Sequence, residues 1–573
     1  MEFFINNIIV ILFLPIWISF IIFFNNFADF SHSKKLTYII TFLNSFAGFI
    51  FSLGCLYYFI ANPMKTFEMN LMWLPFNDFA ISFGILIDKL SCLFLSLFFF
   101  INLTIQTYSY HYLIKNTSFH MFFIILNLFN FSVVSFLLSN NLIQSCIFLI
   151  LINAICYLFN NFSYNTIDVS NKIKNIFLLN GLSDICLLTS IVSFIYFILN
   201  YSQDADVSSL LFINLSMISL NVNSFVSNGV YIFLMFLFLI SIIIRMGIIP
   251  FHTGPLSLNK SLSCFSSIYI PIVILSLPIF LFIRIWPIFL YNENIFTYLN
   301  HLIILSSIIF AISAIYQIRL NKVLIYLALS KFALVFVILN LGYYKQALYI
   351  TICDVITFAL LFLISGLVLY NFNYSDNLKY IKLNSKIPLV CFLIGIVSLS
   401  NLFFAGFFSL KLISYNLLSD KDILLFIIIN VISFLVTFAS FRLFFILYNK
   451  DKTFDNKSQW IKLPIVILTL PLILLSCFEK YFTLEICSIK FNLISKIYLM
   501  FNILGIIITY KLSQQNALIN LKPKLIQNIA INNLYANDFF FIIKRFYKFL
   551  CKIINIQPFC IFEKISKRED KTL

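Results

Sequence analysis

The sequence is poor in charge, glycine and histidine, and each shortage excludes a class of function. Only 10% of its 573 residues are charged, too few to cover a soluble protein of this length. The 12 Gly form no glycine-rich phosphate loop, and the 5 His form no HxxxH or HExxH pattern. The 12 Cys include no CxxC pair and no Cys near a His at ligand spacing, which favours buried apolar cysteines. The sequence thus contains no recognisable site for a nucleotide, flavin, iron–sulfur cluster, haem or metal.

Apolar residues, by contrast, are abundant. They make up 61% of the chain, and the mean hydropathy is strongly positive, which indicates a protein embedded in lipid. The first apolar run, residues 8–24, lacks a basic n-region and a small-residue cleavage site, so it predicts a retained helix. The net charge of +16 comes from Lys and Arg placed between apolar runs, which suits membrane topology better than binding of nucleic acid.

Long apolar runs predict an all-α polytopic membrane protein with 14–15 transmembrane helices. A helix needs about 20 apolar residues to cross the hydrocarbon core. Segment 206–221 is shorter and rich in Asn and Ser, which favours an interfacial position. The predicted spans are 8–25, 37–60, 82–104, 119–138, 142–162, 174–199, 229–250, 263–283, 302–318, 323–341, 347–371, 388–410, 422–448, 462–478 and 491–510.

Charge in the connecting loops predicts the orientation of these spans. Lys and Arg are more numerous after odd-numbered spans than after even-numbered ones, so the N-terminus is expected outside and the C-terminal tail inside. The tail contains "NNLYANDFFFIIKRFYKFLCKIINI", with apolar residues on one side and Lys544, Arg545, Lys548 and Lys552 on the other. This pattern fits a helix lying in the membrane interface as well as one docked along a neighbouring protein.

Seven ionisable residues fall inside or at the ends of the apolar runs. Charge at membrane depth is costly and usually pairs or lines a hydrated path. Lys89, Lys331 and Arg442 are expected near span ends, with their side chains extending to the headgroups. A partner or a function is expected for Asp184, Arg245 and Asp354, and Asp88 is the seventh such residue.

The stretch "SIIIRMGIIPFHTGPLSL", residues 241–258, places Arg245 close to Pro250 and His252. Pro breaks a helix, and the freed carbonyls are tolerated in a membrane only where protein or cavity water satisfies them. Arg stays protonated in proteins, so Arg245 can balance a carboxylate but cannot relay a proton. Its counter-ion is expected to be Asp184 or Asp354.

Six short stretches occur in an order that a known family shares. They are "FGILIDKLSCLFL" (83–95), "NLFNFSVVSFLLSNNLIQ" (127–144), "RMGIIPFHTGPLSL" (245–258), "QIRLNKVLIYLALSK" (317–331), "ALLFLISG" (359–366) and "AGFFSLKLI" (405–413). Together they resemble the antiporter-like membrane subunits of respiratory complex I, the family of NADH dehydrogenase subunit 5 and bacterial subunit L. The resemblance implies the antiporter-like fold followed by a shortened amphipathic lateral helix. It divides the chain into N-terminal helices 1–3 (1–118), an antiporter-like core (119–450), C-terminal helices (451–520) and a basic lateral arm (521–573).

The chain departs from this family at most of its titratable positions. The family's fifth-helix Glu, seventh-helix Lys and eighth-helix His correspond to Ile150, Arg245 and Ile270. Its eleventh-helix H-x-x-x-H-x-x-x-K becomes Ile350, Asp354 and Phe358, and its twelfth-helix Lys falls on Leu410, with Lys411 about 100° further around the helix. The remaining candidates for a proton relay are Asp184, Arg245, Lys331, Asp354 and Lys411.

Three functions compete on this basis. The first is a membrane-arm subunit of a proton-translocating NADH:quinone oxidoreductase, the second a non-pumping scaffold paralogue, and the third a large subunit of a multisubunit sodium/proton antiporter. An unrelated membrane protein is disfavoured by the ordered motifs. The resemblance implies other complex I membrane subunits as partners in a bacterial plasma membrane or mitochondrial inner membrane. It also implies that NADH, flavin, iron–sulfur clusters and quinone bind to those partners.

Overall fold

The computed structural model separates into two units, Met1–Leu521 and Lys522–Leu573. All described residues belong to the first unit. The predicted lateral arm and the predicted interfacial segment 206–221 lie outside the described residues. The structure describes residues 8–27, 34–62, 65–75, 80–114, 118–162, 167–201, 229–258, 263–289, 293–371, 376–381, 383, 385–402, 406, 410, 413–414, 416–417, 422–448, 459–482 and 493–515.

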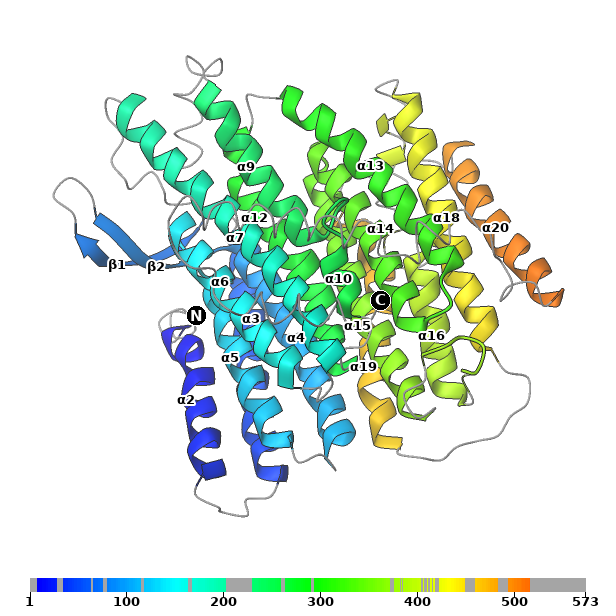
Figure 1. Cartoon of the computed structure of the whole chain (residues 1–573), viewed down its shortest axis with the longest axis horizontal. Coiled ribbons are helices and arrows are strands. Elements are labelled where there is room, and N and C mark those ends of the chain that lie inside the picture. Colours follow the sequence, from blue (N-terminus) through cyan, green and yellow to red (C-terminus); the bar gives the residue numbers. More distant parts are fainter. Residues whose placement is uncertain are drawn as a thin grey trace, which may run out of the picture. The chain divides into compact units, whose positions relative to one another are not determined.

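Helices dominate the described chain (Figure 1), which confirms the predicted all-α membrane class. Two of them are not α-helices: η4 is a π-helix and η5 a 3₁₀-helix. The helices are α2 (Ile8–Phe27), α3 (Lys34–Ala61), α4 (Lys89–Leu113), α5 (Phe119–Leu137), α6 (Leu142–Phe162), α7 (Ile167–Tyr201), α9 (Gly229–Met246), α10 (Thr253–Ser257), α11 (Ser263–Ile268), η4 (Tyr269–Ser276), α12 (Leu277–Ile285), η5 (Trp286–Phe289), α13 (Glu293–Tyr316), α14 (Leu320–Asn340), α15 (Tyr344–Asn371), α16 (Lys386–Leu399), α18 (Ile423–Leu447), α19 (Gln459–Phe482) and α20 (Leu493–Gln514).

The apolar helices reproduce the predicted series of spans. Within the described residues, 10 helical segments are long and apolar enough to cross a membrane, and the shorter apolar helices α2, α9, α16, α19 and α20 supply the rest. The apolar window of α14 is wholly buried, and those of α15 and of the segment Ser263–Ile285 nearly so. These helices therefore form the interior of the bundle, whereas less than half of the apolar windows of α3 and α7 is buried. Exposed apolar side chains on such outer helices suit contact with lipid.

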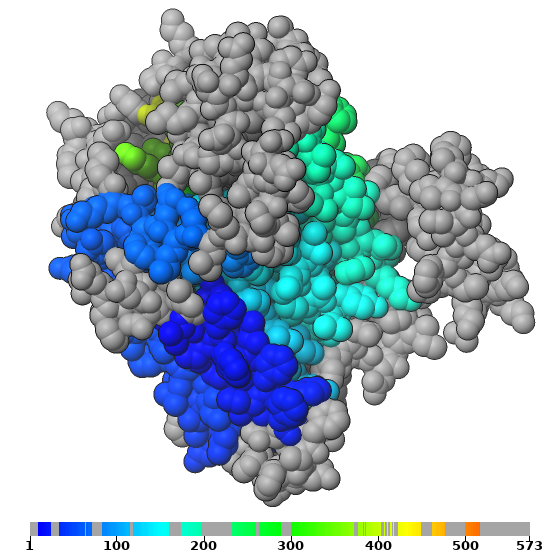
Figure 2. All heavy atoms as spheres, turned by 90° about the vertical axis from the view of Figure 1, so that its left-hand side faces the viewer, coloured from blue at the N-terminus to red at the C-terminus, as the bar shows by residue number. Residues whose placement is uncertain are grey.

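One predicted span, 82–104, is wrong at its start. Residues Ala80–Ile87 form strand β2, which pairs antiparallel with β1 (Phe67–Pro75) in the hairpin labelled in Figure 1. In Figure 2 the atoms of this part of the chain are lighter blue than those of the N-terminal helix. Leu86 N donates to Leu138 O at 2.9 Å, and Gly84 N donates to Gln144 Oε1 at 3.0 Å. These bonds tie the strand to the α5–α6 connection. A short apolar run cannot be assigned to strand or helix from periodicity alone, which explains the error.

Three breaks interrupt the buried helices. As predicted, the chain leaves α9 before Pro250, with Gly247 at φ 67° and a cis peptide bond before the proline. The predicted span 388–410 is also interrupted: α16 ends at Leu399, and Asn401 follows at φ 50°. The third break is η4, which lies between α11 and α12. Such irregular backbone survives at membrane depth only when protein or water satisfies its polar groups.

The start of α4 and the end of α12 are joined by an ion pair. Asp88 is the N-cap of α4, where Oδ1 accepts from Ser91 N at 2.8 Å in a capping box. Arg284 donates through Nη1 and Nη2 to the two Asp88 carboxylate oxygens, each at 2.7 Å. Burial raises the pKa of Asp88, but the Arg284 charge and the hydrogen bonds from Arg284 and Ser91 outweigh burial and lower it. The two-pronged contact fixes the hairpin end of α4 against the core.

We predict that Asp88→Asn lowers the free energy of unfolding by about 1–2 kcal/mol near pH 7, a value between those of exposed and buried pairs. Asn caps a helix as well as Asp does, so the change removes the charge and spares the cap. Because the folded-state pKa of Asp88 is lowered, its stabilisation is complete above the unfolded pKa of about 3.9 and disappears as the pH falls through the folded value.

Thermal unfolding of both proteins in detergent, followed from pH 7 to pH 3, measures this. The two curves should converge at the acid end. A difference that stays the same at both ends of the pH range would contradict the role of the charge.

Candidate functional site

Asp184 and Arg245 form the first group of buried charges. Arg245 Nη2 donates to Asp184 Oδ1, and both residues are 5% exposed. Asp184 lies on α7 and Arg245 on the last turn of α9, and these two helices pack together. The structure therefore selects Asp184, rather than Asp354, as the counter-ion of Arg245.

Polar side chains from two other elements complete this centre. Asn153 on α6 donates to Asp184 Oδ2 at 3.3 Å, and Asn180, one turn before Asp184, donates to the Tyr269 hydroxyl of η4 at 2.8 Å. Ser183 donates to Ser241 O at 2.8 Å, which allows α7 and α9 to approach closely. A buried guanidinium stays charged, so this pair is neutral as a unit and holds its proton on Arg245. Its chemistry is that of a fixed dipole.

Ile150 does not face this pair. It is 39% exposed, whereas Asn153, three residues later on the same helix, is buried against Asp184. An acidic residue at position 150 would thus have pointed away from Arg245 in this arrangement. The observed partner of Arg245 is Asp184 on α7, and α6 contributes Asn153, which contacts Asp184, rather than residue 150.

The break that follows α9 places His252 beside the core. His252 is the N-cap residue of α10, its Nδ1 is buried without a hydrogen-bond partner among the described residues, and its ring lies 5.6 Å from that of Phe310. The sequence prediction of a broken helix at Pro250 and His252 is therefore met in the backbone.

Lys331 and Asp354 form the second group. Lys331 on α14 is 3% exposed and Asp354 on α15 is 1% exposed. The two charges influence each other electrostatically, yet they do not form an ion pair within 4.0 Å. Asp354 Oδ2 has no hydrogen-bond partner among the described residues. This pair thus differs from Asp184 and Arg245, which are in direct contact.

Asn401 supplies the contact that Asp354 does not. Its amide has one orientation that satisfies both polar atoms, with Oδ1 accepting from Lys331 Nζ at 2.8 Å and Nδ2 donating to Ser398 O at 3.0 Å. Amide orientation is assigned from such a network, and the reverse orientation would leave like atoms facing each other.

Two expectations about lysine and arginine are wrong. Lys331 and Arg442 do not reach a surface: Arg442 on α18 is 1% exposed, and its Nη1 donates to Gln317 O at 3.0 Å. A backbone carbonyl just past the C-terminal end of α13 satisfies this charge inside the bundle. Lys89, in contrast, is exposed at the first residue of α4, as expected.

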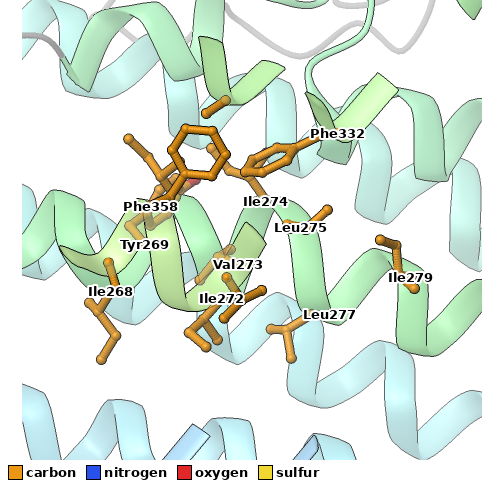
Figure 3. Close-up of a cluster of buried hydrophobic side chains, with 14 of the residues drawn as sticks. Ile268, Tyr269, Ile272, Val273, Ile274, Leu275, Leu277, Ile279, Phe332 and Phe358 are labelled. Carbon is orange, nitrogen blue, oxygen red and sulfur yellow. The ribbon is translucent and has the colours of Figure 1, made fainter. Parts of the chain in front are cut away.

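An apolar cluster adjoins both centres (Figure 3). Tyr269, which accepts from Asn180, lies with Ile272, Val273, Phe332 and Phe358 around η4, and the last two rings meet edge to face at 5.4 Å. Phe332 follows Lys331 directly, and Phe358 lies one turn after Asp354. Ile270 and Phe358, at positions where the family has titratable residues, are buried. Hydrocarbon therefore fills the region between the elements that carry the two charged groups.

The structure gives little information on the remaining candidates, which are Lys411 and a possible metal site. Lys411 lies outside the described residues, and its neighbour Leu410 is buried. Across the described part of the chain, no three His, Cys, Asp or Glu side chains gather where they could hold a metal ion. Sequence reasoning missed Asn153, Asn401 and the pairing of Asp88 with Arg284. The two asparagines carry a signal in the sequence, since each is an amide inside an apolar run.

We predict that Asp184→Asn lowers the free energy of unfolding by about 3–5 kcal/mol, because it leaves the Arg245 charge buried without its counter-charge. Asp354→Asn is the matched control, since it makes the same change in an equally buried carboxylate that has no ion-pair contact. Its cost should stay near the ordinary value of about 1 kcal/mol. Unfolding in detergent measures both, and equal losses at the two sites would refute the assignment of Asp184.

Comparison with known proteins identifies the family of this bundle. Residues 139–437, more than half of the chain, match the transmembrane model of the NADH:quinone oxidoreductase/Mrp antiporter family. Residues 73–123 match the N-terminal model of complex I (NADH-ubiquinone oxidoreductase) chain 5. Both matches agree with the resemblance found in the sequence, and the first contains Asp184, Arg245, Lys331 and Asp354.

Individual relatives support the same family. NADH-quinone oxidoreductase subunit L of Buchnera aphidicola is 26% identical over 559 residues, which cover 92% of this chain and 88% of the relative. Chloroplastic NAD(P)H-quinone oxidoreductase subunit 5 of Chara vulgaris is 25% identical over 379 residues, 64% of this chain and 56% of the relative. The same subunit of Piper cenocladum is 26% identical over 299 residues, 52% of this chain and 40% of the relative. With a family model matching more than half of its length, the chain belongs to the NADH:quinone oxidoreductase/Mrp antiporter transmembrane family.

Proposed function

We propose that this chain is a membrane-arm subunit of an NADH:quinone oxidoreductase and that it carries protons through the centre formed by Lys331 and Asp354. The single observation that supports proton transport is that these two buried, oppositely charged groups are close enough to interact and yet are not paired. Family membership and a match over most of a subunit L support the assembly.

The chemistry of the two side chains fits proton transfer. Lys can lose its proton when buried, unlike Arg, and a carboxyl group can accept one. Transfer of one proton from Lys331 Nζ to Asp354 leaves both groups neutral, and the reverse transfer restores both charges. Asp354 Oδ2 can take the proton without breaking an existing hydrogen bond. A centre that switches between charged and neutral forms is the element a proton carrier needs.

Asp184 and Arg245 take a different part in this proposal. Their direct ion pair keeps the proton on Arg245, so this centre supplies a fixed charge arrangement close to the break before Pro250. Among the described residues around η4, the Tyr269 hydroxyl contacts Asn180, and the apolar side chains of Ile272, Val273, Phe332 and Phe358 lie around it. Lys411 remains a candidate for continuing the route beyond Lys331.

The proposal also assigns the surroundings of the chain. NADH, flavin, iron–sulfur clusters and quinone would bind to partner subunits, and this chain would contribute no redox group. It would lie in an energy-transducing membrane, bacterial or mitochondrial, with its N-terminus outside and the C-terminal arm inside. Loop charge supports this orientation.

A second candidate function is a non-pumping scaffold in the same assembly. It is favoured by the apolar residues at the family's titratable positions, above all Ile270 and Phe358, which are buried in the cluster around η4. A single-file proton route fails when one titrating or hydrated step is lost. The two candidates share a partner set and differ only in whether protons move at Lys331.

We predict that the tagged chain, purified gently from native membranes, co-purifies with the membrane subunits of an NADH:quinone oxidoreductase. Mass spectrometry of the purified material identifies them. Recovery with small antiporter subunits instead would contradict the assembly and support sodium/proton exchange.

Proton transport is tested on the same assembly in proteoliposomes. Lys331→Met and Asp354→Asn should each lower the number of protons moved per NADH oxidised while NADH oxidation by the uncoupled enzyme persists. Lys89→Met is the matched control, because Lys89 is an exposed lysine at a helix start. Unchanged proton ratios in both core variants would exclude transport at this centre and favour the scaffold.

A further inference from the structure

Asn401 occupies an unusual backbone position at the break after α16. Its φ of 50° lies in the left-handed region, which Asn tolerates better than other non-glycine residues. The residue is 2% exposed, although it is polar and lies at membrane depth in an apolar stretch. A residue held in such a conformation and buried in this way has a local reason for being there.

The side chain of Asn401 is held at its Nδ2 end. Nδ2 donates to Ser398 O, a carbonyl near the end of α16. Gly406, at φ 95°, packs against this same end of the amide, where an added Cβ would come within 2.7 Å of it. The glycine thus leaves room for the amide, and the amide cannot swing away without loss of its bond to the helix end. Asn401 Oδ1 is presented rigidly to Lys331 Nζ at 2.8 Å.

Lys331, in contrast, is attached through a flexible side chain. A lysine ammonium on its four-carbon stem can turn toward any acceptor within reach. In the buried interior an opposite charge attracts it more strongly than a neutral amide does. Arg245 shows the result of such attraction in this same chain, since it contacts Asp184 directly. Lys331 and Asp354 interact electrostatically but have not closed into the same kind of pair.

We propose that Asn401 is a positioning residue that holds the Lys331 ammonium away from the Asp354 carboxylate and so prevents a permanent ion pair. The amide competes for Lys331 Nζ from the break that follows α16. This inference deepens the proposed function, on which its role in proton transfer rests, because a closed pair would be as static as Asp184 with Arg245. The separation itself is a structural property and can be tested without transport.

The test is a double-mutant cycle between positions 331 and 354, carried out in two backgrounds. Lys331→Met, Asp354→Asn and the double variant are made in the natural chain and in Asn401→Gly. Glycine accepts the positive φ, so this change removes the side chain without straining the backbone. The measured quantity is the shift in thermal unfolding temperature in detergent, and its departure from additivity reports direct contact between the two side chains.

With Asn401 present, the two single shifts should nearly add. In Asn401→Gly, Lys331 is free to close onto Asp354, so the sum of the single shifts should clearly exceed the shift of the double variant. The same departure from additivity in both backgrounds would overturn the proposal, since a residue that merely stabilises the break lowers all unfolding temperatures alike.

A second measurement covers the case in which Asn401→Gly does not fold. A high-resolution structure of the natural assembly should show Lys331 Nζ hydrogen-bonded to Asn401 Oδ1, and Lys331 Nζ in direct contact with Asp354 would overturn the proposal. Asn401→Asp tests whether the position of the Lys331 ammonium affects proton transport. A carboxylate at position 401 pairs with Lys331 and should suppress proton movement. Loss of transport in Lys331→Met tests the proposed function, whereas the cycle tests Asn401, so failure of either is recognised separately.

Discussion

The need to balance every buried charge inside the protein governs the arrangement of this bundle. Lipid cannot solvate an ammonium, a guanidinium or a carboxylate, so such groups are stabilised by polar partners inside the bundle, and Asp354, whose Oδ2 has none among the described residues, is the exception. The chain uses three solutions. Asp184 and Arg245 pair directly, Arg442 donates to a backbone carbonyl at Gln317, and Lys331 rests against the amide of Asn401. Each solution brings together residues from different helices and so fixes how those helices pack.

The breaks in the helices and the buried charges occur together for the same reason. Arg245 lies on the last turn before the break at Pro250, and Lys331 contacts the residue that follows the end of α16. A helix end exposes carbonyl or amide groups that a continuous helix would use internally, and these groups carry partial charge. A broken helix thus provides polar contacts in a region where intact helices offer only apolar side chains.

Much of the fold was predictable, because hydrophobic length is a strong signal in a membrane protein. The predicted span 323–341 is apolar and long, and it corresponds to α14 (Leu320–Asn340) in the interior of the bundle. The predicted span 82–104 starts wrongly, because Ile81–Ile87 is apolar enough for a helix but belongs to strand β2. Its pairing with β1 cannot be recognised from the local pattern of apolar residues. The break after Leu399 was also missed, since it contains no proline and depends on positive φ at Asn401 and Gly406.

The candidate site was only partly predictable. The sequence identified Asp184, Arg245, Lys331 and Asp354 as residues requiring explanation, and it narrowed the counter-ion of Arg245 to two carboxylates. It did not decide between them, because direction around a helix and packing against a neighbour are tertiary properties. Lys331 and Arg442 were placed near the surface by their distance from the ends of apolar runs, and the true helix packing buries both.

The ion pair between Asp88 and Arg284 can form only after a long part of the chain has been synthesised. The two residues are 196 positions apart, so α4 is synthesised long before its partner charge exists. The chain is synthesised from its N-terminus, so Asp88 lacks its counter-charge until Arg284 has been added. Asp88 is the N-cap of α4, so water and the backbone amide of Ser91 can stabilise its carboxylate until Arg284 has been added. Formation of the Asp88–Arg284 ion pair then joins the start of α4 to the end of α12.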